Sequence, residues 1–197
     1  MIQGKSRSIV RISALIAAGV VLAGAFAVFK FDVMTQEQEK LPPLTDARLV
    51  VRKSARKLEV YDGEKHVKTF QMVLGFTPNG DKEVEGDGKT PEGEFYVFTK
   101  NPESRFHLSL GVSYPGKDDA ARGLKQKLIS QTEHDEIVTA LDEKRMPPQK
   151  TKLGGEIYIH GGGTASDWTV GCVALKDEEI TELFDAIPVG TRVSIMP

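Results

Sequence analysis

Residues 154–175 read GGEIYIHGGGTASDWTVGCVAL, and this stretch decides most of the fold and the chemistry. Its first seven residues end on His160 after a short apolar run, which predicts a strand that delivers the histidine to the edge of a sheet. Twelve positions later comes Cys172, the single cysteine of the 197-residue chain, directly after Gly171. A histidine leaving a strand and a lone thiol beside a glycine are the parts of a cysteine-nucleophile site.

The chemistry of such a pair is acyl transfer. A thiol with a pKa of about 8.5 is a few per cent thiolate at neutral pH, and a nearby imidazole raises that fraction. The attacked carbonyl becomes an oxyanion that needs N–H donors, and the glycine before Cys172 permits a close backbone approach. The competing interpretation is that Cys172 is a small buried hydrophobe. The glycine, threonine and tryptophan around it favour a reactive thiol over an aliphatic core position.

Towards the N-terminus, residues 12–29 form an uncharged apolar run. Lys5, Arg7 and Arg11 precede it, and Lys30 closes it. A helix of this length spans about 27 Å, close to the about 30 Å of a bilayer core. The basic flank predicts that the N-terminus is cytoplasmic and that the rest of the chain lies outside.

The sequence therefore predicts a cytoplasmic segment at residues 1–11 and a transmembrane signal anchor at residues 12–29, with a periplasmic domain held at the inner membrane. Signal cleavage is the alternative, since residues 25–27, Ala-Phe-Ala, resemble a small-x-small cleavage site. Cleavage would secrete the domain into the periplasm. The run continues apolar through Val28 and Phe29, which favours the uncleaved anchor.

The remainder of the chain is predicted to be a linker, residues 30–47, and one domain, residues 48–197. The 26 basic and 28 acidic side chains are interspersed and give a net charge of −2, so no basic field indicates nucleic acid. No two of the four histidines have zinc-ligand spacing, and one cysteine cannot build a thiolate cage. We expect neither a metal nor a cofactor.

From residue 48 the hydrophobic period is mostly two, which predicts a mainly β domain, either a β-sandwich or a partly open barrel, with a few helices. Asp62-Gly63 is a hairpin-turn signal, and Asp177 is a plausible N-cap for a helix that Pro188 ends. The expected strands are residues 49–51, 57–61, 67–74, 94–98, 106–110, 154–160 and 192–196; the other expected helices are residues 118–130 and 133–144.

Three segments, in order, resemble the L,D-transpeptidase catalytic domain (YkuD) family of bacterial cell-wall enzymes. Residues 86–95, GDGKTPEGEF, match the family's GDGkTPeGxF segment, and residues 189–193, VGTRV, match its closing strand. Residues 159–161, IHG, followed by residues 169–172, TVGC, resemble its catalytic signature. The likeness covers most of residues 48–197 and implies the β-rich L,D-transpeptidase catalytic fold.

The resemblance implies an enzyme whose cysteine attacks a peptidoglycan stem peptide. In the family, the thiol acylates at the third residue, usually meso-diaminopimelate, and expels the terminal D-alanine. An amine on a second stem or on a lipoprotein then resolves the thioester. Carried onto this chain, Cys172 is the nucleophile and His160 the base. The backbone amides of Gly171 and Cys172 are oxyanion candidates, and Thr169 stands where the family has serine or threonine.

The candidates for substrate binding are Trp168, Tyr114, His107 and Gly161. As buried aromatics, Trp168 and Tyr114 suit a core position equally well. His107 alternates with Phe106 on an expected strand, which suits a residue at the edge of the core or of a pocket.

Two positions depart from the commoner signature. Val170 stands where that signature has histidine, and Ala174 where it has arginine or asparagine. The chain therefore resembles the YafK-like branch, which includes a hydrolase of the lipoprotein–peptidoglycan link. Three functions stay open: a transpeptidase on stem peptides, an amidase or carboxypeptidase that uses the same Cys–His site on stems or on a wall-linked lipoprotein, and a catalytically silent wall-binding module.

Overall fold

The computed structural model describes residues 40–197. The predicted cytoplasmic segment, the predicted anchor and residues 30–39 of the predicted linker lie outside the described residues. Within residues 40–197, none of the helices has the length and apolar character that a membrane span requires. Leu41 and Leu44, from the part of the predicted linker that the structure describes, pack against the core of the domain.

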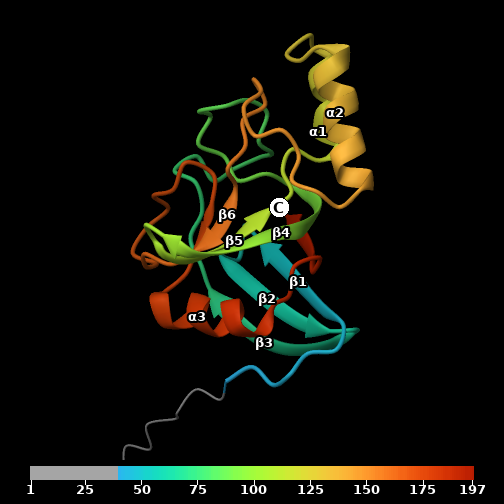
Figure 1. Ribbon diagram of the computed structural model, residues 1–197. Helices are drawn as coiled ribbons and strands as arrows, with labels where there is room; N and C mark the ends of the chain where they lie inside the picture. The colour runs from blue at the N-terminus through green and yellow to red at the C-terminus, as the bar shows by residue number, and fades with distance from the viewer. Residues whose placement is uncertain (1–39) are drawn as a thin grey trace, which may run out of the picture. The chain divides into compact units, whose positions relative to one another are not determined.

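The body of the domain is one eight-stranded sheet (Figure 1). Its strands lie in the order β3-β2-β1-β8-β4-β5-β6-β7, and β1 runs parallel to β8 although the two lie at opposite ends of the domain sequence. The strands are β1 (Ala47–Arg52), β2 (Lys57–Asp62), β3 (Lys65–Gln71), β4 (Gly93–Ser104), β5 (His107–Val112), β6 (Tyr158–His160), β7 (Val173–Ala174) and β8 (Arg192–Met196).

The two ends of this sheet meet. Directly after β3, which is one edge, Val73 forms an antiparallel bridge to Ala174 of β7, the other edge. A second bridge joins Gly75 to Thr169. The sheet therefore curls into a partly open barrel, and the contact protects the backbone groups of both edges. The mainly β prediction is confirmed, and of the two expected architectures the structure has the barrel.

The core follows from strand alternation. Leu49 and Val51 of β1 pair with Val60 and Leu58 of β2, and all four side chains are fully buried. Helix α3 (Asp177–Ala186) packs Ile180, Leu183 and the following Ile187 into the same cluster. Lys176 is the N-cap of α3, so the helix begins one residue earlier than the sequence predicted. The Asp177 carboxylate instead accepts the N–H of Gly162, at 2.8 Å.

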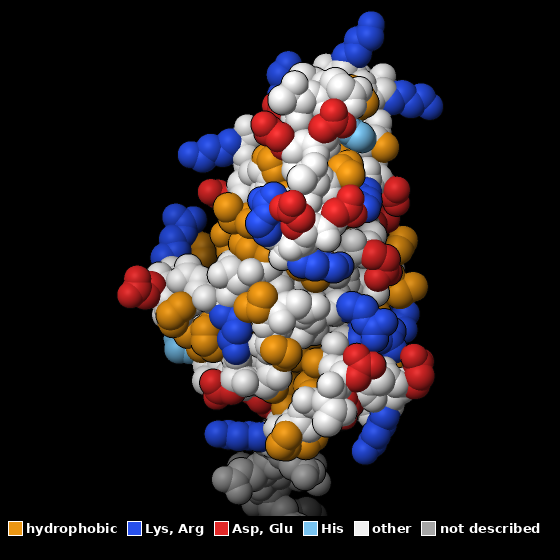
Figure 2. All heavy atoms as spheres, turned by 45° about the vertical axis from the view of Figure 1, so that its right-hand side comes forward, with side chains coloured by type: hydrophobic (Ala, Val, Ile, Leu, Met, Phe, Trp, Pro, Cys, Tyr) orange, Lys and Arg blue, Asp and Glu red, His pale blue; other side chains and the backbone are white. Residues whose placement is uncertain are grey.

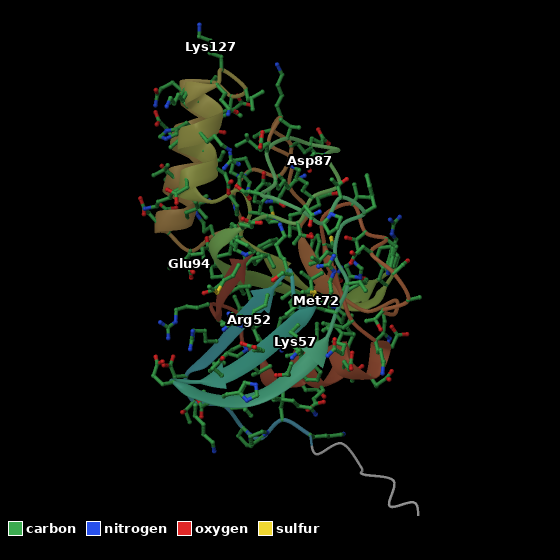
Figure 3. All side chains as sticks on the ribbon, turned by 180° about the vertical axis from the view of Figure 1, so that it is seen from behind. Arg52, Lys57, Met72, Asp87, Glu94 and Lys127 are labelled. Carbon is green, nitrogen blue, oxygen red and sulfur yellow. The ribbon has the colours of Figure 1, made fainter. Side chains whose placement is uncertain are left out.

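A helical hairpin is inserted between β5 and β6 and stands beside the barrel (Figure 1). It comprises α1 (Lys117–Lys125) and α2 (Gln131–Asp142), where residues 118–130 and 133–144 were predicted. Helix α1 stops early because Lys127, at the tip of the hairpin in Figure 3, adopts the left-handed conformation with φ 58°. Ser130 caps α2 by accepting the N–H of Glu133. On the face that carries this hairpin, Figure 2 shows acidic and basic side chains interspersed.

Three predicted strands stop short at one end. The strand predicted over residues 67–74 ends at Gln71. The strand predicted over residues 154–160 is reduced to β6, since Gly154 and Glu156 both have positive φ and interrupt the extended chain. The strand predicted from Phe106 begins one residue later. Ser104 pairs with His107, so Arg105 and Phe106 form the two-residue turn between β4 and β5.

Candidate active site

Strands β6 and β7 bring His160 and Cys172 together. They are parallel, with Ile159 opposite Val173 and His160 opposite Ala174. Because side chains alternate along a strand, Cys172 lies on the same face of the sheet as His160. Both side chains line one cavity of about 1100 Å³. Its other walls come from the β4–β5 turn, the loop at residues 82–86 and the connection from α2 to β6.

The Cys172 thiol is half-buried among backbone groups. Its Sγ accepts the N–H of Tyr158 at 3.4 Å and donates to the carbonyl oxygen of Glu156 at 3.4 Å. Burial raises the pKa of Cys172 to about 11, an effect that the Tyr158 N–H opposes and the Glu156 carboxylate adds to. At neutral pH the thiol is therefore protonated and needs a base before it can attack a carbonyl.

The His160 imidazole is suited to that role. It is buried, and its Nδ1 lies 2.6 Å from the carbonyl oxygen of Gly161. A carbonyl only accepts hydrogen bonds, so Nδ1 carries the proton and Nε2 keeps its lone pair. Burial lowers the pKa of His160, which keeps the ring neutral near pH 7. The group that orients His160 is thus a backbone carbonyl; Asp167 instead binds Arg56, at 2.6 Å.

Two aromatic side chains fix the plane of the imidazole. Phe106 stacks on His160 with ring centres 4.7 Å apart and planes 22° apart. Trp168 stands edge-on to both rings, at 5.2 Å from Phe106 and 5.5 Å from His160. Both aromatics line the cavity, as the sequence predicted for Trp168 but not for Phe106. In the sequence Phe106 looked like one more apolar position of a strand, and only the turn places it over the histidine.

The turn before Cys172 depends on the Thr169 hydroxyl. This buried Oγ1 donates to the Cys172 carbonyl oxygen at 2.8 Å and accepts the N–H of Gly171 at 3.2 Å. In this conformation the Gly171 amide, one of the two oxyanion candidates, is thus engaged by Thr169. Within residues 40–197 the N–H of Cys172 makes no hydrogen bond, and it remains the oxyanion candidate.

The GDGKTPEG segment supports this turn from behind. Gly171 has φ 132°, and a β-carbon there would lie 2.7 Å from the carbonyl oxygen of Lys89, so only glycine fits. Asp87, in the loop labelled in Figure 3, holds its own segment in place. Its carboxylate accepts from the buried Lys82 at 2.9 Å and from the N–H of Lys89 at 3.0 Å. The motif therefore supports the turn before Cys172; Gly86 also lines the cavity, whereas Lys89 does not.

Three predicted substrate-binding residues lie elsewhere. Tyr114 is fully buried, donates to the carbonyl of Leu153 at 3.0 Å and does not line the cavity. His107 is exposed outside the cavity, with its ring 2.8 Å from the Thr181 hydroxyl on α3. Gly161 acts here through its backbone, by accepting from His160. In the described part of the chain no group of three or more His, Cys, Asp or Glu side chains could hold a metal ion.

The curled β-sheet thus sets a thiol and a neutral imidazole in one cavity, which is the arrangement of a candidate cysteine–histidine site. The sequence model of the L,D-transpeptidase catalytic domain (YkuD) matches residues 46–195. The chain belongs to this family.

This chain is similar to several solved structures. The helical cell shape determining protein Pgp2 from Campylobacter jejuni is 22% identical, with a TM-score of 0.51, over 79% of this chain and 50% of Pgp2. Mycobacterium tuberculosis L,D-transpeptidase 1 is 15% identical, with a TM-score of 0.44, over 77% of this chain and 62% of that protein. The chain thus spans about half the length of Pgp2. A comparison with curated proteins gives no match.

Proposed function

We propose that this protein is a cysteine acyltransferase of the L,D-transpeptidase type that acts on peptidoglycan stem peptides. The observation that carries the proposal is the shared cavity, in which a protonated thiol and an imidazole with a free Nε2 lie on one sheet face. Family membership supplies the substrate class.

The reaction follows from the protonation states. His160 Nε2 takes the thiol proton as Cys172 Sγ attacks the stem carbonyl, and the N–H of Cys172 stabilises the oxyanion. The imidazolium then protonates the leaving amine, the C–N bond breaks and a thioester remains. An amine, in transfer, or water, in hydrolysis, attacks the thioester; His160 accepts its proton, and the thiol is restored.

Hydrolysis is the second candidate, and the surroundings of the thiol favour it. Val170, where the commoner signature has histidine, is 65% exposed and lines the cavity, while Ala174 is buried. Neither side chain offers a polar group to hold an acceptor amine. The same site would then act as a carboxypeptidase on stems or release a wall-linked lipoprotein.

We place the domain in the periplasm, because the family acts on the cell wall and residues 12–29 have the composition of a signal anchor. The anchor would hold the catalytic domain at the inner membrane, within reach of its substrate. If the signal were cleaved instead, the secreted domain would reach the same substrate in the periplasm. Fractionation of cells that express the full chain, with detection of its C-terminal end, distinguishes the two.

Mass spectrometry of the products tests the function. The full chain and the Cys172→Ala variant are incubated with purified disaccharide-tetrapeptide. Loss of D-alanine with a new cross-linked dimer, absent with the variant, establishes transfer, whereas loss of D-alanine to tripeptide alone establishes hydrolysis. Activity that survives Cys172→Ala would refute thioester chemistry. No reaction on this substrate or on lipoprotein-linked peptidoglycan would refute the proposal that the protein is an enzyme. It would support a catalytically silent wall-binding module.

A further inference from the structure

Arg105 is a cation of the cavity wall that has no acidic partner in the described part of the chain. It is exposed at the turn between β4 and β5, and its side chain lines the cavity. Within residues 40–197 this guanidinium makes no ion pair or hydrogen bond. By contrast, the buried Lys82, which also lines the cavity, is bound to Asp87 at 2.9 Å. Arg105 therefore has its N–H donors free for a ligand.

Phe106 contacts both Arg105 and His160, the proposed base. Its guanidinium carbon lies 4.7 Å from the ring centre of Phe106, and Phe106 in turn stacks on His160, also at 4.7 Å. A cation–π contact uses the face of the guanidinium and leaves its edge open to a carboxylate. The charge also reaches the reacting groups: burial is the main cause of the lowered pKa of His160, and Arg105 lowers it further.

The position of the Arg105 guanidinium relative to His160 indicates which substrate group the guanidinium would bind. As the acid of the proposed reaction, His160 must contact the nitrogen of the leaving residue. When that residue is the last of the peptide, its carboxylate is two bonds from the same nitrogen, about 2.5 Å away. In the proposed reaction the leaving carboxylate would thus lie next to the imidazole, in the cavity whose wall includes Arg105.

We propose that Arg105 binds the terminal carboxylate of the leaving amino acid and so selects stem peptides that end one residue beyond the scissile bond. This inference rests on the proposed function and adds the residue that determines specificity. A leaving amine on a side chain, as in a link to a protein, carries no carboxylate on the adjacent carbon. Arg105 would therefore favour release of a terminal amino acid over release of a linked protein.

Paired substrates test the assignment. The full chain and Arg105→Gln are compared on a disaccharide-tetrapeptide with a free C-terminal carboxylate and on the same compound with a C-terminal amide. Loss of a charge-assisted bidentate contact should lower kcat/KM on the carboxylate substrate by about 10- to 100-fold. The amide substrate should show little change, and Arg105→Lys should keep part of the preference.

Lys150→Gln is the matched control, since Lys150 is another exposed cation of the cavity wall, from the connection between α2 and β6. We expect it to cause no selective loss on the carboxylate substrate. The same selective loss with Lys150→Gln would mean that the overall charge of the cavity attracts the peptide, and the assignment to Arg105 would fail. Equal losses of kcat/KM on both substrates with Arg105→Gln would mean that Arg105 only packs on Phe106, and the assignment would fail.

Binding separates this inference from the proposed function. Calorimetry with Cys172→Ala and with Cys172→Ala/Arg105→Gln measures the affinity for both peptides without turnover. Carboxylate-dependent binding that requires Arg105 supports the inference even if the wild-type chain releases no D-alanine, which would overturn only the reaction. Turnover without any dependence on Arg105, in rate or in affinity, would overturn the inference and leave the proposed function standing.

Discussion

The Thr169 hydroxyl offers the sharpest test of how the nucleophile is held. Thr169→Val keeps the shape of the side chain but removes the donor to the Cys172 carbonyl and the acceptor for the Gly171 N–H. The side chain is 3% exposed, so water does not replace these bonds. The Gly171 N–H then has no partner, and the Cys172 carbonyl keeps only the Thr90 hydroxyl, at 3.5 Å. Loss of these two hydrogen bonds should cost about 2 to 4 kcal/mol of the free energy of unfolding.

Thr169→Ser is the matched control. It keeps the hydroxyl and loses one methyl group, which should cost about 1 kcal/mol. Urea denaturation of both variants and the wild-type chain measures the difference, and D-alanine release shows whether Cys172 keeps its position. We expect Thr169→Val to be clearly less stable and less active than Thr169→Ser. Equal stabilities would refute the reasoning that this hydroxyl holds the turn.

Three further predictions follow from the same geometry. Gly171→Ala should destabilise the chain by about 1 to 3 kcal/mol in urea, because its β-carbon meets the Lys89 carbonyl in a left-handed conformation; unchanged stability would contradict this. Alkylation of Cys172 by iodoacetamide should rise up to a pH of about 11, and at pH 7 a thiol moved from 9.0 to about 11 has about 100-fold less thiolate; a midpoint near 9 would argue against the buried thiol. D-alanine release needs a neutral His160 and should be lost only as the pH falls through a pKa below 6.5, so an acid limb above 6.5 in kcat/KM would contradict the lowered pKa.

Local patterns predicted the elements whose own side chains make the core. The alternation around β1 and β2 and the 3.6-residue period of α3 each place apolar groups on one face, and this pattern is visible without the fold. The ends of elements were less predictable. The end of α1 depends on the left-handed Lys127, a residue type that gives no signal for that conformation.

The residues of the candidate site also fall into those that the sequence predicted and those that it did not. Cys172 and His160 stood out in the sequence because thiols and imidazoles carry distinctive chemistry and each lies beside glycine. Tyr114 was assigned to the pocket wall because an aromatic suits a pocket and a core equally, and only burial separates the two. Phe106 and Arg105 were missed because the hairpin register, which no local pattern shows, puts Phe106 over the imidazole and Arg105 over Phe106.

By itself, the sequence determined a mainly β domain, its family and the candidate pair of Cys172 and His160, because these depend on residue type and spacing along the chain. The tertiary structure decided that the sheet closes between β3 and β7, that Nε2 of His160 is the free nitrogen, and that Thr169 occupies the Gly171 amide. These depend on register and burial, which arise only when segments distant in sequence pack together and exclude water.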